Sequence, residues 1–293
     1  MLFGGLETGG TKMVCAIADE NLNIIERAQF DTLAPSETMP KMINFFSQYD
    51  IKALGISCFG PIDLNKKHKT YGYILKTTKL LWAMYDIVGE FSKALNVPIG
   101  FDTDVNGACL AEAKVGAGKG LDNVAYYTIG TGIGVGLWLN GTLQHGLLHP
   151  EGGHIFIKRH PKDNYVGKCV FHHDCLEGLA SGPAIQERFS VEAKELTGNK
   201  EYLDIESYYI AQGVCNSIYS YSPEIVILGG GVMHSPGLIE EVRSKTVEML
   251  NGYIQADEII KDIDNYIVLP KLADNAGALG SILLAIQEYK ENQ

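Results

Sequence analysis

The sequence has no apolar run long enough to cross a membrane and no close-set cysteine pattern typical of a disulfide framework. A membrane helix needs about 20 consecutive apolar residues, and no stretch approaches that length. The first residues, MLFGGLETGG, include neither a basic segment nor a small-residue cleavage site, so we expect no secretory signal. Four of the six cysteines stand singly in apolar runs, where buried free thiols are expected. These features favour a reducing, cytoplasmic location.

Basic clusters are also missing. The net charge is −11 over 293 residues, and the charged residues are interspersed. An acidic chain without a basic stripe argues against nucleic acid as the main partner. It leaves room for a nucleotide, because backbone amides and one or two cations can bind phosphate locally. Length and apolar content favour two domains over a single core.

Strands and helices alternate in two similar runs along the chain. The first run predicts strands over 2–7, 12–18, 24–30, 52–58 and 98–101, with helices over 37–48 and 86–95 and after 104. The second predicts strands over 123–129, 133–139, 225–231 and 266–270, with helices over 235–251 and 276–289. This duplication predicts two α/β lobes with a cleft between them. We place the boundary in the glycine-rich bend 116–121, which gives lobes over 1–117 and 118–275, and expect the last helix, within 276–293, to return to the first lobe.

Three glycine-rich strand ends predict a nucleotide site. Residues 7–12 (ETGGTK) and 130–136 (GTGIGVG) each join two apolar strands, where glycine lets backbone amides approach phosphate oxygens. Thr11 and Thr131 add hydroxyl donors, and Lys12 adds a charge. A third strand runs into ILGGGVM, which suits a base or ribose lying on backbone. Either of the two turns alone would be interpreted as an ordinary β-hairpin turn, but three matching strand ends favour a nucleotide cleft. The P-loop pattern is missing, and no helix follows G-x-G-x-x-G, which argues against a dinucleotide site.

The segment CVFHHDC is the one place where cysteines and histidines gather. Cys169, His172 and Cys175 offer three ligands within seven residues, in a spacing that suits zinc. A structural zinc site takes four ligands, so one must come from elsewhere. At this point His173, His160 and Asp174 remain open as the fourth ligand.

Eight motifs then occur in order along nearly the whole chain: GGLETGGTK, CFGPID, DTDVNGACLAE, GTGIGVG, HPEGGH, the C-x2-H-x2-C loop, CLEGLASGP and ILGGGVM. Together they resemble the ROK family (repressors, open reading frames, kinases) and, more narrowly, its bacterial fructokinases. The resemblance implies a two-lobed actin/hexokinase-like, ribonuclease H-like α/β fold, phosphorylation of a hexose at the 6-hydroxyl with MgATP, and a homodimer. The family's repressors carry an N-terminal helix-turn-helix domain, for which we expect no room here, so the kinase branch is favoured.

The resemblance also assigns the acid–base residue. Its D-x-N-x-A pattern matches Asp104 and Asn106, and phosphoryl transfer needs a carboxylate to accept the proton of the sugar hydroxyl. Asp102 is the competing candidate, and a helix-capping role for Asp104 is the structural alternative. Thr103 stands where many glucose-using relatives have asparagine, which favours the fructokinase branch.

The other roles implied by the resemblance fall into three groups. The sugar contacts are Gly60, Thr103, Asp104, Glu151, His154 and Glu177, although both glutamates alone would be taken for solvated surface residues. The MgATP contacts are Glu7, Gly9, Gly10, Thr11, Lys12, Gly130, Thr131, Gly132, Pro183, Gly229, Gly230, Gly231, Val232 and Met233. The structural zinc ligands are His154, Cys169, His172 and Cys175, and the zinc would hold the segments of Glu151 and Glu177 together.

D-Fructose is the hexose that these features favour, with conversion to fructose 6-phosphate. Mannose, glucose or an N-acetylhexosamine is the alternative substrate. An alternative of another class is a zinc-stabilised sugar sensor without turnover, against which the retained Asp104 and both phosphate turns argue.

Overall fold

The computed structural model describes residues 1–77 and 79–293. The chain forms two compact units, each built around its own five-stranded sheet. Unit 1 comprises Met1–Glu112, His145–His149 and Asp274–Gln293. Unit 2 comprises Ala113–Gln144 and Pro150–Ala273.

The sheet of unit 1 has the strand order β3-β2-β1-β4-β7. An antiparallel meander of β1 (Leu2–Thr8), β2 (Lys12–Asp19) and β3 (Ile24–Asp31) is extended by β4 (Ile51–Cys58) and β7 (Ile99–Thr103), both parallel to β1. Because β1 and β4 are almost wholly buried, the sheet must be covered on both faces.

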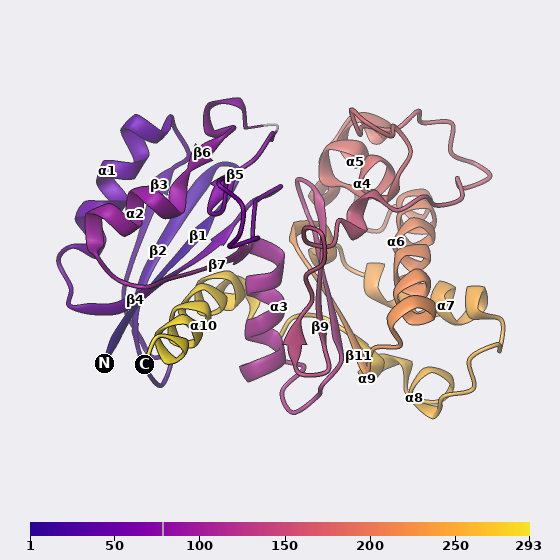
Figure 1. Ribbon diagram of the computed structural model, residues 1–293. Coiled ribbons are helices and arrows are strands. Elements are labelled where there is room, and N and C mark those ends of the chain that lie inside the picture. The colour runs from indigo at the N-terminus through magenta and orange to yellow at the C-terminus, as the bar shows by residue number, and fades with distance from the viewer. Residues whose placement is uncertain (78) are drawn as a thin grey trace. The chain divides into compact units, whose positions relative to one another are not determined.

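Helices cover the two faces of this sheet. Residues of α1 (Pro35–Phe46) and α2 (Ile87–Leu95) share an apolar cluster with one face, and α10 (Ala276–Glu291) packs on β4, β1 and β7 at the other. Figure 1 shows α10, in yellow, beside the indigo and purple strands, so the last helix does belong to the first sheet. The close approach depends on Gly55, where a methyl group would lie 1.8 Å from the Ser281 carbonyl oxygen. Smaller elements are η1 (Leu80–Trp82) and the pair β5 (Tyr73–Ile74) and β6 (Tyr85–Asp86), and α3 (Asp104–Val115) follows β7 directly.

The sheet of unit 2 repeats this plan with the order β10-β9-β8-β11-β12. An antiparallel meander of β8 (Val124–Ile129), β9 (Ile133–Leu139) and β10 (Thr142–Leu143) is extended by the parallel strands β11 (Ile225–Gly229) and β12 (Ile267–Val268). Its helices are α4 (Leu176–Ala180), α5 (Gly182–Phe189), α6 (Lys200–Tyr221), α7 (Leu238–Leu250), α8 (Asp257–Ile260) and α9 (Ile263–Tyr266), with 3₁₀ turns η2 (Gly152–His154), η3 (Ala193–Glu195), η4 (Gly231–His234) and η5 (Ala273–Asn275, which continues into unit 1). The matching strand orders confirm the predicted duplicated α/β fold class.

Two predicted strands are shorter in the structure. The strand predicted over 225–231 ends at Gly229, because Gly230 has φ of +91° and its backbone lies against Ile129. The strand predicted over 266–270 pairs only at Ile267 and Val268. Within the described residues all six cysteines are free and buried, and no helix is long and apolar enough to span a membrane.

Candidate active site and metal centre

The turn between β1 and β2 presents an exposed backbone in unit 1. The Gly9 amide donates to the Lys12 carbonyl oxygen at 2.9 Å, which closes the turn. Thr32, which directly follows β3, holds the turn in place: its hydroxyl donates to the Gly9 carbonyl at 2.8 Å, and its amide donates to the Thr11 carbonyl at 3.0 Å. Gly10, Thr11 and Lys12 are exposed. The turn is therefore held from behind while its outer edge remains accessible to a ligand.

Glu7 lies close to this turn, on the last part of β1. A methyl group built on Gly277, at the start of α10, would come within 2.2 Å of the Glu7 carboxyl carbon. The carboxylate thus rests against the amino end of α10, where the partial positive charge of the helix favours an anion.

Three consecutive residues, Asp102, Thr103 and Asp104, lie where β7 ends and α3 begins, and the structure gives each a different role. The Asn106 backbone amide donates to the Thr103 hydroxyl oxygen at 3.1 Å, so Thr103 makes the capping bond that was the structural alternative for Asp104. Asp102 is buried, and its Oδ1 accepts from the Thr103 amide at 2.7 Å and the Asn106 side chain at 2.8 Å. Asp104 is the first residue of α3 and half-buried. The geometry therefore favours Asp102 as a structural carboxylate and Asp104 as the reactive one.

Two histidines of the short segment His145–His149 also belong to unit 1, and neither was predicted from the sequence to take part in the site. His145 Nε2 lies 2.7 Å from Asp102 Oδ2, and this carboxylate raises the pKa of His145. His149 Nε2 accepts from the Ile62 amide at 3.2 Å, and a methyl group on Gly60 would lie 3.3 Å from its ring. The available signal was the pair of histidines in HGLLH, whose second histidine, His149, is also the first residue of HPEGGH.

In unit 2 the structure brings together the two predicted nucleotide segments of that unit, 130–136 and 228–233. The Gly130 carbonyl accepts from the Gly182 amide at 2.7 Å, which joins the turn between β8 and β9 to the start of α5, where Pro183 follows. A methyl group on Gly130 would lie 3.8 Å from the Gly231 amide nitrogen, so the segment 229–233 lies beside the turn between β8 and β9. Val232 and Met233 point into the hydrophobic core, so only their backbone can face a ligand.

The four predicted metal ligands also come together. The ligand atoms of His154, Cys169, His172 and Cys175 all lie within 4.8 Å of one another. The Nδ1 atom of His154 is 3.7 Å from Cys169 Sγ and 3.5 Å from Cys175 Sγ, and His172 Nδ1 is 3.6 Å from Cys169 Sγ. Zn–S and Zn–N bonds of about 2.3 and 2.0 Å at tetrahedral angles place sulfur and nitrogen roughly 3.5 Å apart. The donor set and its spacing therefore fit zinc.

The other candidates for the fourth ligand lie outside the four-residue cluster. His160 is buried, with Nε2 3.5 Å from Asp204. Asp174 pairs with Arg159 at 3.1 Å. The His173 amide donates to the Cys169 carbonyl at 2.9 Å, and its side chain is not part of the four-residue cluster. The geometry thus favours His154.

Glu177 connects the cluster to the turn between β8 and β9. Its Oε2 accepts from the Ile133 amide at 3.0 Å, directly after Gly132. Its Oε1 lies 3.9 Å from His154 Nε2, whose other ring nitrogen faces the cluster. Partial desolvation and then the Glu177 carboxylate raise the pKa of Glu151, so Glu151 lies within electrostatic reach of Glu177. A carboxylate behind a ligating histidine is a common way to fix its ring orientation.

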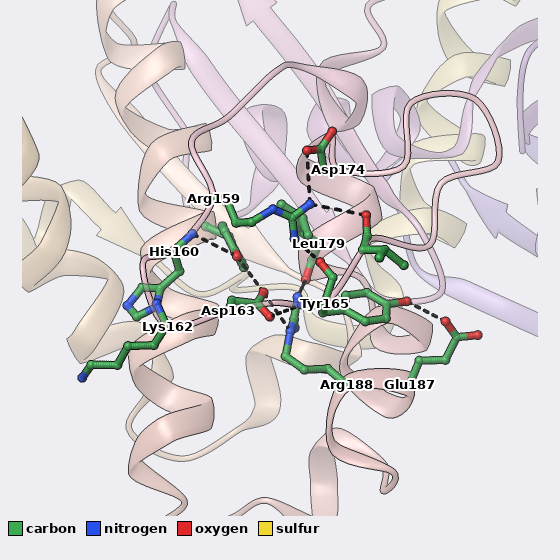
Figure 2. A network of polar contacts seen from close by, with 11 residues as sticks. Arg159, His160, Lys162, Asp163, Tyr165, Asp174, Leu179, Glu187 and Arg188 are labelled. Atoms are coloured by element: carbon green, nitrogen blue, oxygen red, sulfur yellow. Dashed lines mark hydrogen bonds and ion pairs between the residues drawn. The ribbon is translucent and has the colours of Figure 1, made fainter.

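A buried polar network holds the loop that carries the cysteines (Figure 2). Asp163 Oδ2 lies 3.0 Å from Arg188 Nε and accepts from the Tyr209 hydroxyl at 2.7 Å, while its Oδ1 accepts from the Tyr165 amide at 2.9 Å. Arg188, on α5, also donates to the Leu179 carbonyl on α4 at 2.6 Å. The network anchors the loop to α4, α5 and α6 through contacts that do not involve the four residues of the cluster.

Glu206 is the unusual member of this region. It lies fully buried on α6, and neither carboxylate oxygen has a hydrogen-bond donor among the described residues. Burial raises its pKa well above the ordinary value, Arg188 opposes the rise, and Asp163 adds to it.

We expect Glu206→Gln to stabilise the protein at pH 8 by about 1–3 kcal/mol, the cost of a buried uncompensated polar group. The folded protein binds the proton of Glu206 more tightly than the unfolded chain does. Wild-type stability should therefore fall as pH rises above the ordinary carboxyl range, and the variant should lack this slope. Urea unfolding from pH 5 to 8 measures the free energy of unfolding of both proteins. The variant Glu201→Gln, at an exposed position on the same helix, is the control. Parallel pH profiles for wild type and Glu206→Gln would contradict the expectation.

Known proteins resemble this chain in sequence along nearly its whole length. The ROK family model matches residues 3–288. A fructokinase of Streptococcus mutans serotype c (strain ATCC 700610 / UA159) is 42% identical over 290 residues, covering 97% of both chains. A fructokinase of Lactococcus lactis subsp. cremoris is 43% identical over 286 residues, covering 97% of this chain and 96% of its own.

Solved structures agree on the fold. A ROK hexokinase from Thermus thermophilus has a TM-score of 0.81 at 24% identity, covering 99% of this chain and 100% of its own. A ROK family glucokinase from Streptomyces griseus, solved with glucose and AMPPNP, has a TM-score of 0.74 at 21% identity and covers 98% and 100%. At these identities the likeness is one of fold alone.

Proposed function

The chain belongs to the ROK family, and from that premise we propose that it is an ATP-dependent hexose kinase that converts D-fructose to D-fructose 6-phosphate. One observation carries the proposal: the chain is more than 40% identical to two fructokinases along nearly its full length. The site supports it, since Asp104 stands at the start of α3 and three glycine-rich segments present backbone amides.

In this proposal Asp104 is the general base. It accepts the proton of the sugar 6-hydroxyl while that oxygen bonds to the γ-phosphorus and the bond from phosphorus to the β,γ-bridging oxygen breaks, which releases ADP. Asp102 holds the backbone of Thr103 and the side chain of Asn106, so the base starts from a fixed position. Glu151, Glu177 and the Nε2 of His154 would accept or donate hydrogen bonds to sugar hydroxyls, and Gly60 would form part of the pocket wall.

The nucleotide contacts are proposed for the glycine segments. The amides of Gly10 and Thr11 and those of Thr131 and Gly132 would bind phosphate oxygens, with Lys12 adding charge. Gly9 and Gly130 would shape these turns, since their own amides donate to the Lys12 and Gly132 carbonyls at 2.9 Å. Gly182-Pro183 and Gly229–Met233 would offer backbone to the nucleoside. Mg²⁺ would arrive with ATP and neutralise phosphate charge, and Glu7 would bind it directly or through water.

We propose one zinc ion for each chain, held by His154, Cys169, His172 and Cys175. Four protein ligands leave no open coordination position, so the site would be structural. Through His154 and Cys175 it would hold the Glu151 segment against α4, which carries Glu177.

We also propose that the enzyme is a cytoplasmic homodimer. The free, buried state of all six described cysteines suits a reducing compartment. Exposed apolar side chains on unit 2, such as Phe156 at 82% and Tyr253 at 79% exposure, are candidates for burial between subunits.

Thr103→Asn should raise the ratio of glucose to fructose efficiency by roughly 5–150-fold, equivalent to about 1–3 kcal/mol. Asparagine caps helices at least as well as threonine, so α3 should keep its start, while the longer amide adds a donor and an acceptor. Measuring kcat/KM for both sugars tests this, with thermal unfolding as a check on the cap. An unchanged ratio would place the discrimination elsewhere, with the Glu151–His154 segment as the next candidate.

Nuclear magnetic resonance of the product tests the proposed reaction itself. The expected outcome with ATP and fructose is phosphate on the 6-oxygen. Phosphate on another oxygen, or no sugar phosphate, would contradict the proposal.

A further inference from the structure

Lys79 lies over the turn between β1 and β2, although the motif does not include it. A methyl group built on Gly10 would lie 3.0 Å from the Lys79 Nζ and 3.1 Å from its Cε. Lys12 lies at the same turn, with its Cγ 4.0 Å from a methyl group built on Gly9. Two lysine side chains therefore flank a turn whose amides suit phosphate.

The position of Lys79 is set by a short series of hydrogen bonds back to this turn. The Trp82 amide donates to the Lys79 carbonyl at 2.8 Å, and the Trp82 indole N–H donates to the Leu33 carbonyl at 2.8 Å. Leu33 follows Thr32, whose hydroxyl donates to the Gly9 carbonyl at 2.8 Å. Trp82 itself is 1% exposed and packs edge-on against Phe59 and Tyr85. A buried tryptophan thus fixes the backbone that carries Lys79 relative to the turn.

The charge around Lys79 also favours an anionic ligand. Between Asp63 and Asp86 the sequence has five lysines and no carboxylate, in a chain whose net charge is −11. Lys79 is half-buried, whereas Lys12 is exposed. Within the part of the chain that the structure describes, no ion pair of Lys79 with a carboxylate is found, while Lys66 of the same segment pairs with Glu288 at 3.5 Å. A half-buried ammonium beside phosphate-binding amides is well placed to bind a phosphate oxygen.

We infer that Lys79 is a catalytic residue that binds the terminal phosphate of the nucleotide at this turn. The inference rests on the proposed kinase function and adds a residue to it. As the bond from the sugar oxygen to the γ-phosphorus forms and the bond to the β,γ-bridging oxygen breaks, negative charge shifts over the transferred group and the departing ADP. A fixed ammonium at this place stabilises that charge without moving, while the proton of the sugar hydroxyl passes to Asp104.

Lys79→Met tests this role, because it keeps the aliphatic stem and removes the charge. Turnover should fall roughly 10²–10³-fold, the usual loss when one preorganised donor is removed. By calorimetry the affinity for ATP should fall roughly 10–100-fold, while the affinity for AMP should stay unchanged. Lys79→Arg should recover part of both losses. The matched control is Lys67→Met, an exposed lysine of the same segment, which should behave as wild type.

Three outcomes would overturn the role of Lys79. These are near-normal turnover and ATP affinity in Lys79→Met, an equal loss of AMP affinity, or an equal loss in Lys67→Met, which would indicate a general charge effect. A wild-type protein without hexose kinase activity would instead contradict the proposed function. In that case the difference between ATP and AMP binding would still decide whether Lys79 binds the terminal phosphate.

Discussion

Replacing Asp104 with asparagine should lower kcat by roughly 10²–10⁴ and leave sugar affinity and the fold nearly intact, since this is the usual contribution of a general base. Asparagine keeps the shape of the side chain but cannot accept the proton of the sugar hydroxyl. Thr103 accepts the capping bond of α3, and the Oδ1 of asparagine can still accept from the Val105 amide as that of Asp104 does at 2.9 Å, so the start of the helix should be kept. Steady-state kinetics together with sugar binding to the variant separates the loss of chemistry from a loss of affinity.

Asp102→Asn is the matched control for this experiment. Asp102 is 3% exposed and bonded to Thr103, Asn106 and His145, so its exchange should act on stability and on the pKa of His145 more than on proton transfer. Near-normal turnover in Asp104→Asn, with a large loss in Asp102→Asn, would move the base to Asp102.

Loss of the metal should raise the sugar KM sharply. We expect the purified protein to contain one zinc per chain, a strong chelator to remove it, and Cys175→Ser to weaken binding, because a hydroxyl is a much poorer zinc ligand than a thiolate. The sugar KM should then rise by roughly tenfold or more, since His154 and Glu177 would lose their common support. Nucleotide affinity should change less, although the bond from Glu177 to the Ile133 amide predicts some effect.

A buried cysteine outside the cluster provides the control for the metal experiment. Cys215 lies on α6 with its thiol 3.8 Å from the Thr246 carbonyl, so Cys215→Ser should retain zinc. A metal assay on both variants, paired with sugar and nucleotide binding, makes the comparison. A metal-free preparation with unaltered sugar KM would contradict the tethering role of the Cys/His cluster.

The strands and the turns between them were predictable from sequence, because apolar runs bounded by glycine carry a strong local signal. The predicted duplication agrees with two sheets of identical strand order. The fourth member of the metal cluster was not predictable from spacing, since His154 lies 15 residues before Cys169 and meets it only through tertiary structure. The resemblance supplied His154, and the geometry then favoured it over His160.

Other features of the site could not be predicted from the sequence, because they depend on contacts in the folded structure. Helix capping was the structural alternative for Asp104, because aspartate caps helices well, yet the helix begins at that residue and the preceding threonine makes the bond to the Asn106 backbone amide. His145 reaches Asp102 across 43 residues of sequence, and Lys79 reaches Gly10 across a longer span. Contacts between distant segments leave no periodic pattern in the sequence, so propensity and spacing could not indicate them.

The most direct test of the central claim is the rate of ADP production by the wild-type protein across a panel of hexoses, with magnesium and ATP present. We expect sugar-dependent ADP formation with the highest kcat/KM for D-fructose, ahead of mannose, glucose and N-acetylhexosamines, and almost no ADP formation without sugar. A higher kcat/KM for another hexose would contradict the assigned substrate, and ADP formation that no hexose stimulates would contradict the assignment as a hexose kinase.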